Sequence, residues 1–554
     1  MSEKPVVLMP EDIQRVMGKD AQRNNILAAR MVSEVVKTTL GPKGMDKMLV
    51  SPTGDIIVTN DGVTILEEIQ IEHPAAKMMV EIARTQESEV GDGTTSSVMI
   101  AGKLLENAEK LLDSKIHPTL ITKGYRMAAE KAQQILNEIS LKISPDDDDV
   151  LKQVAMTAMT GKGAEDSREK FADIIIRAVK QIGDFHSSES TQSFERKQVQ
   201  KNWKVDLDDI KIEKAKGDSV EKTELISGIV LDKEKVSNEM PEKIEGAKIA
   251  LIDFPLEIKN PEIETKISIS SPEQLQNFLS QEEKVIKDMV EKVAESGANV
   301  IFCQKGIDDF AQYLLSRKKI YACRRVAKSD LEKISKATGA KIVSNLGELK
   351  DVDLGKSEVV EEIKQGEDNM TYIRGCSNPK AVTILIRGGS EHVIDEIERA
   401  IKDGLGDVAS SLKTGLVVPG GGAIEIELSK RLKHFGQSLG GREQLAVEEF
   451  ASALEFIPLT LAENAGMDPI DVLTELKSKH NAGDMNAGLN LFENKVDNVL
   501  NAKIIEPYKI KSQAIASATE VAIMILRIDD VIASADSKSG KMNYAGSKGY
   551  QGMD

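Results

Sequence analysis

The sequence predicts a multidomain protein of α and α/β composition, in which helical segments at the two ends of the chain enclose an inserted α/β segment. Its 554 residues are too many for one hydrophobic core. Apolar residues recur at helical spacing near both ends, whereas short β-prone runs alternate with helices between residues 216 and 372. This order indicates that the two ends of the chain meet in one domain.

The composition argues against several classes of protein. A net charge of −17 disfavours a general nucleic-acid binder or a protein of anionic membrane surfaces. The cysteines, Cys303, Cys323 and Cys376, are far apart and indicate neither a disulfide framework nor a zinc site. The N-terminus lacks the features of a signal peptide, and no apolar run approaches the ~18 residues of a membrane span. We therefore expect a cytoplasmic protein.

Residues 20–140 are predicted to be mostly helical, with one β-hairpin. β-prone residues lie on both sides of Asn60-Asp61-Gly62 and predict a hairpin turn there, because that turn requires positive φ. Apolar residues at helical spacing on both sides of residues 91–96 predict two amphipathic helices that flank this second turn.

The Pro- and Asp-rich run at 143–151 predicts a domain boundary. Residues 184–209 are polar and irregular, which predicts an exposed excursion. Residues 255–281 show little of the apolar pattern that indicates a buried core before the helix at their end. A buried strand at 381–389 leads into an amphipathic helix, and helices dominate again from about residue 407. The apolar positions of that amphipathic helix are Ile394, Ile397, Ile401, Leu405 and Val408.

The run EVGDGTTS at residues 89–96 places an aspartate between two glycines, before three hydroxyl residues. A glycine-rich turn that opens a helix can hold a phosphate, because unpaired backbone N–H groups and the helix dipole point at the anion. The hydroxyls of Thr94, Thr95 and Ser96 could cap the next helix while its N–H groups hold the anion, although the same run also suits an ordinary turn between two helices. The Asp92 carboxylate would repel a phosphate unless a divalent cation lies between them. The run therefore predicts either a plain turn or a site for phosphate and metal.

Other candidate carboxylates have a structural interpretation beside a functional one. Asp61 is, by its type and position, a turn residue. Asp403 lies opposite the apolar stripe of its helix, together with Asp395, Glu396 and Asp407. From the pattern alone, this side of the helix is predicted to be a solvated carboxylate face.

Three further features leave alternatives open. Lys162 lies between two glycines and is either an exposed loop lysine or a phosphate sensor. The run VVPGGGA at 417–423 costs backbone entropy, which close approach of a ligand or a partner would explain. Glu506 could hold ribose hydroxyls or cap the helix that follows it. The chain has no GxxxxGK[ST] motif, so it is not a P-loop NTPase.

Taken together, these segments resemble a group II chaperonin, most closely the archaeal thermosome, with the eukaryotic cytosolic chaperonin as a relative. The resemblance covers nearly the whole chain and is also carried by FCQKGIDD (302–309) and GREQLAVEEFASALEFIP (441–458). The segments that match in order and spacing are TTLGPKGMDKML (38–49), VTNDGVTIL (58–66), EVGDGTTS (89–96), MTGKGAE (159–165), VVPGGGA (417–423) and EPYKIKSQA (506–514).

The resemblance implies a chaperonin fold with three domains: a helical equatorial domain that binds ATP, a hinge-like intermediate domain and an α/β apical domain that binds unfolded or partly folded proteins. A helical protrusion at about 255–281 would form a built-in lid, so no separate cap protein is expected. Identical or paralogous subunits would form two stacked rings. The implied boundaries are 1–145 with 407–554 (equatorial), 146–215 with 373–406 (intermediate) and 216–372 (apical).

The resemblance also implies a site for ATP and Mg²⁺. Asp92 would coordinate the metal, and Asp61 and Asp403 would be the catalytic residues that position and activate water. Lys162 would sense the terminal phosphate, and Glu506 would receive the ribose hydroxyls. The remaining nucleotide-binding residues would be Leu40, Gly41, Pro42, Gly91, Gly93, Thr94, Thr95, Ser96, Gly421, Gly422 and Gly488.

The activity implied is that of a chamber that folds proteins, with ATP hydrolysis driving lid closure. One alternative is a ring-forming scaffold that binds nucleotide without turning it over, and the presence of Asp61, Asp92 and Asp403 together argues against it. A second alternative, a small-molecule kinase, is disfavoured by the inserted α/β segment and the missing P-loop motif. Neither nucleic acid nor a membrane is expected as a partner.

Overall fold

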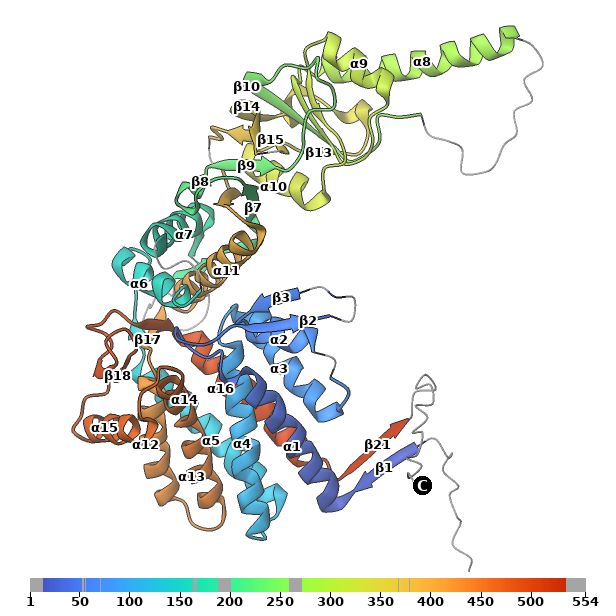
Figure 1. Cartoon of the computed structure of the whole chain (residues 1–554). Helices are drawn as coiled ribbons and strands as arrows, with labels where there is room; N and C mark the ends of the chain where they lie inside the picture. The colour runs from blue at the N-terminus through green and yellow to red at the C-terminus, as the bar shows by residue number, and fades with distance from the viewer. Residues whose placement is uncertain are drawn as a thin grey trace, which may run out of the picture.

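The computed structural model describes residues 13–51, 54, 56–69, 71–162, 167–187, 201–258, 272–366, 368–377 and 379–534. Figure 1 shows a helical bundle at one end, a mixed sheet with helices at the other, and a smaller group around α11 (Glu391–Thr414) between them. The buried core of the bundle combines residues 26–136 with residues 418–526. The predicted class, helical ends around an inserted α/β segment, is confirmed.

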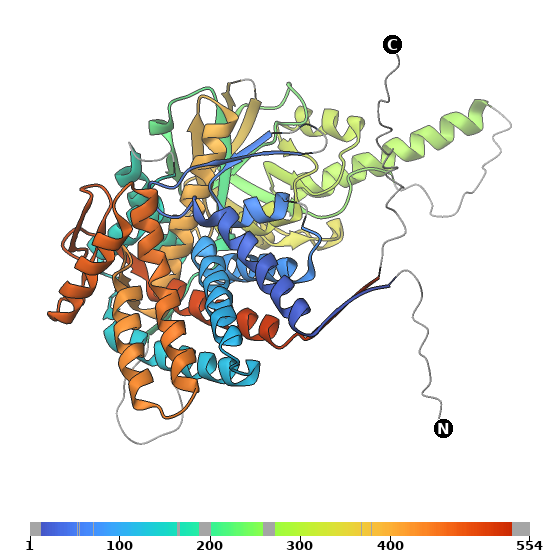
Figure 2. The same cartoon turned by 60° about the horizontal axis from the view of Figure 1, so that its bottom comes forward.

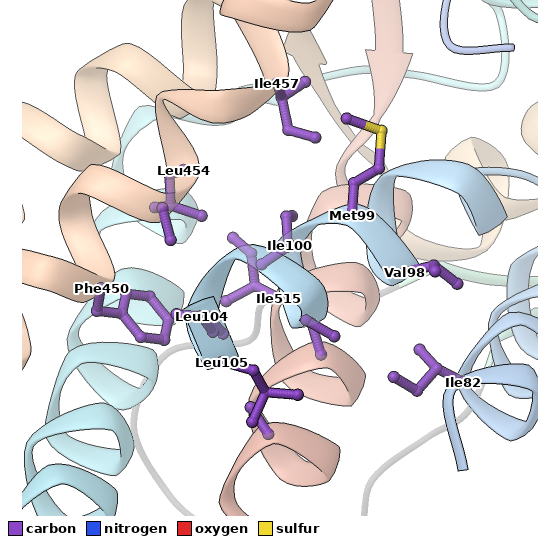
Figure 3. Packing of buried hydrophobic residues seen from close by; sticks show 14 of the residues in the cluster. Ile82, Val98, Met99, Ile100, Leu104, Leu105, Phe450, Leu454, Ile457 and Ile515 are labelled. Atoms are coloured by element: carbon purple, nitrogen blue, oxygen red, sulfur yellow. The ribbon is translucent and has the colours of Figure 1, made fainter. Parts of the chain in front are cut away.

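The bundle is built around α4 (Thr94–Asp113), whose apolar side chains are buried on several sides. Figure 3 shows Leu104 and Leu105 of α4 near Phe450 and Ile515, which come from the C-terminal part of the chain. Tyr125 lies edge-on to Phe450, with ring centroids 5.6 Å apart. The helices of this bundle are α1 (Gly18–Lys37), α2 (Gly62–Glu68), α3 (Pro74–Val90), α4, α5 (Pro118–Ile139), α12 (Ala423–Ser438), α13 (Glu443–Leu454), α14 (Phe456–Asn464), α15 (Pro469–Asn481) and α16 (Tyr508–Leu526).

Small antiparallel sheets join the bundle. They are β1 (Ile13–Met17) with β21 (Asp530–Ser534), β2 (Lys47–Val50) with β3 (Ile56–Thr59), β18 (Ala487–Asn490) with β19 (Lys495–Asn498), and β20 (Ile505–Pro507) with β17 (Leu416–Pro419) and β4 (Leu141–Lys142). The second pair is the only hairpin that the described part of residues 20–140 contains, and it lies before the position that the sequence predicts.

The prediction of a hairpin turn at Asn60-Asp61-Gly62 is therefore wrong. The chain leaves β3 at Thr59 and enters α2 at Gly62. Asp61 caps this helix, because its carboxylate accepts hydrogen bonds from the backbone N–H of Thr64 at 2.8 Å and from the Thr64 hydroxyl at 2.6 Å. A short polar residue before a glycine thus begins a helix here instead of turning a strand back.

The middle group packs α6 (Asp148–Ala158), α7 (Arg168–Ile182) and α11 against a three-stranded sheet. In this sheet β16 (Val382–Gly388) lies between β7 (Ile210–Lys216), which is parallel to it, and β8 (Glu224–Ile226), which is antiparallel. Every residue of β16 is buried, as the apolar run predicts. The five predicted apolar positions of α11 are buried as well.

The predicted exposed excursion at 184–209 is only partly correct. Strands β5 (Asp184–Ser187) and β6 (Lys201–Lys204) pair at its two ends. Trp203 is 4% exposed and packs in the core of the middle group, so this residue is no part of an exposed loop. Residues 188–200 lie outside the described part of the chain.

The third group is a seven-stranded mixed sheet with a buried core on each face. Its strands run in the order β12 (Tyr321–Cys323), β11 (Val300–Cys303), β10 (Lys243–Ile252), β14 (Gly355–Gln365), β15 (Asp368–Arg374) and β9 (Gly228–Leu231), and β13 (Ile342–Val343) also pairs with β10. Helices α9 (Asp309–Arg317) and α10 (Lys328–Thr338) pack against this sheet. Figures 1 and 2 both show α8 (Pro272–Glu295) extending away from it.

The segment predicted to protrude, residues 255–281, contains the first turns of α8, whereas residues 259–271 lie outside the described part of the chain. Among the helices that the structure describes, none combines the length and the apolar character that crossing a membrane requires.

Candidate functional site

A pocket of about 510 Å³ lies where the N-terminal end of α4 faces α11. We call it the α4–α11 pocket. Every residue predicted for the site lines this pocket except Gly488. Gly488 lies beneath it on β18, where an added Cβ would be 2.7 Å from Cγ1 of Val499 and 3.1 Å from the carbonyl oxygen of Gly420. Its neighbour Leu489 lines the pocket instead.

The turn between α3 and α4 is fixed by two glycines and a buried amide. Gly91 ends α3 with φ +89° and Gly93 precedes α4 with φ +81°, a left-handed backbone that glycine adopts without strain. A Cβ at position 93 would lie 2.6 Å from Cγ2 of Ile510. The Gln86 side chain donates a hydrogen bond from Nε2 to the carbonyl oxygen of Asp92 at 2.8 Å. The turn therefore holds one shape, with the first turn of α4 facing the pocket.

The first turn of α4 is suited to an anion. Thr94, Thr95 and Ser96 line the pocket, and no side chain in the described part of the chain caps this helix end. The predicted capping role of these hydroxyls is therefore wrong. The N–H groups of a first turn have no partner within the helix, and they lie at the positive end of its dipole. A phosphate fits this surface.

The segment that carries Lys162 packs on the predicted motif at 40–42. Gly161 has φ +80°, and a Cβ there would lie 2.6 Å from Cα of Pro42. The Asn60 side-chain amide donates to the carbonyl oxygen of Gly161 at 3.3 Å. Three segments that are far apart in the sequence, around residues 41, 60 and 161, thus meet at one wall of the pocket.

Asp403 pairs with Lys162 inside the pocket, and both side chains are 23% exposed. The predicted solvated carboxylate face is therefore wrong for Asp403. Burial raises the pKa of Asp403 to about 7, although the Lys162 ammonium group opposes the increase. For Lys162, burial favours loss of the proton, but the carboxylates of Asp403 and Asp92 outweigh it and raise the pKa.

The solvated-face prediction also fails for Asp407, which is 2% exposed. Its Oδ1 atom has no hydrogen-bond partner among the described residues. Burial raises the pKa of Asp407 well above its usual range, and the carboxylates of Asp92 and Asp403 raise it further. Glu396 also lines the pocket, whereas Asp395 forms an ion pair with Lys214. The four-residue spacing from Asp403 was the one signal that could have placed Asp407 in the site.

The three glycines at 420–422 are required by close packing. An added Cβ would lie 2.6 Å from Oε1 of Glu506 at Gly420 and 2.6 Å from the carbonyl oxygen of Leu489 at Gly421. At Gly422 it would lie 2.7 Å from Cβ of Pro458. Close approach of neighbouring parts of the same chain therefore explains the run, and two of its glycines line the pocket as well.

Glu506 lies on β20 at the edge of the pocket. Its Oε2 atom accepts from Nζ of Lys511 at 2.6 Å, and Lys511 also pairs with Glu425 at 2.9 Å. The alternative that Glu506 caps the following helix is wrong, because the residue before α16 is Pro507 and no described side chain caps that helix end.

Arg168 and Phe492 are two of the pocket residues that the sequence did not predict. Arg168 begins α7 and donates from Nη1 to the hydroxyl of Thr160 at 2.9 Å. Its guanidinium group lies over the ring of Phe492, 5.5 Å from the ring centre. Both Arg168 and Phe492 line the pocket. They connect the middle group to the turn between β18 and β19, a contact that no local sequence pattern signals.

The pocket fits a divalent cation only together with a phosphate. No group of three or more His, Cys, Asp or Glu side chains converges as a metal site within the residues that the structure describes. Mg²⁺ usually binds through one or two carboxylates and completes its shell with phosphate oxygens and water. Asp92 is such a carboxylate, beside the first turn of α4, where a phosphate fits.

The chain is similar to known proteins over nearly its whole length. Residues 32–536 match the model of the TCP-1/cpn60 chaperonin family. The chain is 55% identical to a thermosome subunit of Methanopyrus kandleri, covering 96% of this chain and 95% of that protein. It is 56% identical to thermosome subunit beta of Archaeoglobus fulgidus, with the same coverage.

A solved structure, the open state monomer of a group II chaperonin from Methanococcoides burtonii, is 46% identical with a TM-score of 0.59. The match covers 79% of this chain and 100% of that one. The chain therefore belongs to the TCP-1/cpn60 chaperonin family and is a group II chaperonin of the archaeal thermosome type.

Proposed function

We propose that this protein is an ATP hydrolase whose turnover drives a chamber for folding other proteins. One observation carries the proposal: the α4–α11 pocket joins the uncapped N-terminal end of α4 and Asp92 from the bundle to Asp403 from the middle group. A pocket built from two groups of elements can couple the chemistry of a bound nucleotide to movement of one group against the other.

The nucleotide phosphates would lie at the first turn of α4, against Gly91 and Gly93, with Leu40, Gly41 and Pro42 at the adjoining wall. Asp92 would hold Mg²⁺, which when bound neutralises charge on the phosphates. At the other end of the pocket, Gly421, Gly422 and Glu506 would contact the ribose. Gly488 would support that end from below through β18, without touching the ligand.

Asp403 and Asp61 would orient the attacking water, and Asp403 would accept its proton. A carboxylate is an effective general base when its pKa lies near the working pH, and the pKa of Asp403 is about 7. Lys162 already contacts Asp403, so it can exchange this partner for a terminal phosphate. Since Asp403 lies on α11, hydrolysis would depend on the position of that helix.

The wider proposal is a cytoplasmic, double-ring chamber with domains bounded at residues 145, 215, 372 and 406. The third group, with α8, would bind unfolded or partly folded proteins and provide the lid. Exposed apolar side chains on α8, among them Phe278, Leu279 and Val285, support this, because such surfaces mark sites of protein contact. All three cysteines are free and buried, which suits a reducing compartment.

The test is refolding of a chemically denatured client enzyme by the assembled protein, with and without ATP. We expect ATP to raise the yield of active client, and Asp92→Ala to abolish that gain while assembly, followed by size-exclusion chromatography, is retained. Glu89→Ala, beside the turn on an exposed position, is the matched control. A yield that ATP does not change would favour the scaffold, in which nucleotide is bound and not turned over.

A further inference from the structure

Asp407 is a carboxyl group buried in the pocket, and one of its oxygen atoms has no hydrogen-bond partner among the described residues. It is 2% exposed, lines the α4–α11 pocket, and has no hydrogen bond at Oδ1 within the described residues. An unpaired ionised group in such a place is unfavourable unless something compensates its charge. The roles proposed above for the pocket leave this residue unused.

The backbone brings Asp407 close to the turn that holds Asp92. A Cβ on Gly406 would lie 3.0 Å from the carbonyl oxygen of Val90 and 3.5 Å from Cα of Gly91. Helix α11 therefore crosses the α3–α4 turn with no side chain between the two backbones. The next residue along α11 is Asp407, and Asp92 is the charged group that acts on it most strongly.

Most of the charged groups that act strongly on Asp407 are negative. The carboxylates of Asp92, Asp403 and Glu506 raise its pKa, whereas the Lys162 ammonium group, which is bound to Asp403, lowers it. On the other side, Lys511 is shared between Glu425 and Glu506. Arg168, Arg399, Lys402 and Lys503 also line the pocket. A nucleotide would nevertheless add further negative charge beside these carboxylates, which a cation from solution would offset.

We propose that Asp407 is a second carboxylate ligand for the divalent cation that accompanies the nucleotide phosphates, shared with Asp92. The proposal rests on the nucleotide-binding function proposed above. One or two carboxylates together with phosphate oxygens form a common Mg²⁺ shell. A second carboxylate makes nucleotide binding depend more strongly on the cation, because it can attract the phosphates only through a cation that lies between them.

The variant Asp407→Asn tests this, because it keeps the size and hydrogen-bonding ability of the side chain and removes its charge. ADP affinity of the full-length protein is measured by calorimetry in EDTA and with Mn²⁺, and bound Mn²⁺ is counted by electron paramagnetic resonance. The ratio of the two affinities reports the gain that the cation provides. We expect Asp407→Asn to lower this ratio by about tenfold or more, the usual effect of removing a metal-site partner.

The matched control is Asp395→Asn, which removes one charge from another carboxylate of α11, one that pairs with Lys214. Asp395 does not line the α4–α11 pocket, so the ratio should remain that of the wild type. If Asp407→Asn does not fold, Asp407→Val, an apolar replacement for a buried charge, takes its place with the same expectation.

An unchanged ratio in the Asp407 variant would overturn the proposal. An equal loss of ADP affinity with and without Mn²⁺ would also overturn it, because it would show that Asp407 only supports packing. These outcomes differ from failure of the proposed function, in which the wild-type protein itself would bind no ADP under either condition.

Discussion

Gln86 illustrates how single side chains shape the pocket without facing a ligand. It is fully buried, and its Nε2 atom donates to the carbonyl oxygens of Asp92 at 2.8 Å and Ile510 at 3.3 Å. One amide thus ties the α3–α4 turn to α16, an element from the opposite end of the chain. A turn held in this way presents its N–H groups to a phosphate without first being ordered by it.

We predict that Gln86→Met weakens ATP binding and lowers the free energy of unfolding by about 1–3 kcal/mol, because two buried carbonyl groups lose their donor. Calorimetric titration with ATP and thermal unfolding measure the two effects. Thr85→Ala, at the exposed neighbouring position of α3, should leave both unchanged. An unaltered ATP affinity in Gln86→Met would show that the turn holds its shape without the amide.

Residue types in the sequence predicted part of this pocket. The combination of glycines, Asp92 and a helix start suited a phosphate with a metal as well as a plain turn, and in the structure these residues line the α4–α11 pocket. The environments of Asp403 and Asp407 could not be predicted from a helical wheel. A helical wheel shows which side of a helix is polar, but it does not show which other part of the protein packs against that side. The partner of Asp403 is 241 residues away in the chain.

Among the secondary-structure elements, α12, α15 and β18 are joined by a buried polar cluster. His480 of α15 is fully buried, and its Nδ1 lies 2.9 Å from Oε2 of Glu427 on α12. Its Nε2 lies 2.9 Å from the carbonyl oxygen of Ala487 on β18. This cluster fixes the strand that carries Leu489 into the pocket.

The same cluster predicts a pH dependence of stability. Burial alone would raise the pKa of Glu427, but hydrogen bonds from His480 and Arg431 outweigh it and lower the pKa to about 2. Because this value is below that of an unfolded glutamate, the group stabilises the fold fully at neutral pH. Its contribution is lost as the pH falls from 4.5 toward about 2.

We therefore predict that Glu427→Gln lowers the free energy of unfolding at neutral pH by about 3 kcal/mol or more, the usual effect of breaking a buried pair. The fall in Tm between about pH 5 and pH 3 should also be shallower than in the wild type, since the variant has no carboxylate to protonate there. Differential scanning calorimetry across this range measures both. The control is Glu475→Gln on α15, whose carboxylate forms an exposed pair with Lys479. If the Tm of Glu427→Gln fell with pH as steeply as that of the wild type, Glu427 would not be the source of this pH dependence.

Elements were predictable from sequence where one local signal acted alone. The uninterrupted apolar run of β16 predicted a buried strand, and the structure contains it. The run around Asp61 carried two signals, because an aspartate before a glycine suits both a turn and a helix start. Burial of Val63, Ile65 and Leu66 in the bundle decided for the helix, and only the packed structure supplies that contribution.

For the molecule as a whole, the decisive contact is the crossing of α11 over the α3–α4 turn, where Gly406 meets Gly91. We predict that Gly406→Val displaces α11 from the turn and slows ATP hydrolysis by about 100-fold, because misplacing a catalytic group by about 1 Å has effects of this size. ATP binding to the bundle should persist. Steady-state hydrolysis and calorimetric ATP binding separate the two.

The control for this displacement is Gly389→Val, just before α11, where an added Cβ meets nothing within 4 Å. Wild-type hydrolysis in Gly406→Val would mean that the crossing is not needed for catalysis. The sequence indicated that the two ends of the chain meet, because both are helical. It could not indicate this crossing, because two glycines that touch leave no pattern of size or charge.

The most direct measurement compares steady-state ATP hydrolysis and ATP binding in the assembled wild-type protein and in Asp403→Ala. The control is Asp395→Ala, two turns earlier on α11, whose side chain pairs with Lys214. We predict that Asp403→Ala binds ATP and hydrolyses it about 100-fold or more slowly, the usual loss for a general base, while the control keeps the wild-type rate. Equal rates in Asp403→Ala and the wild type would contradict catalysis by a carboxylate that α11 brings to the bundle.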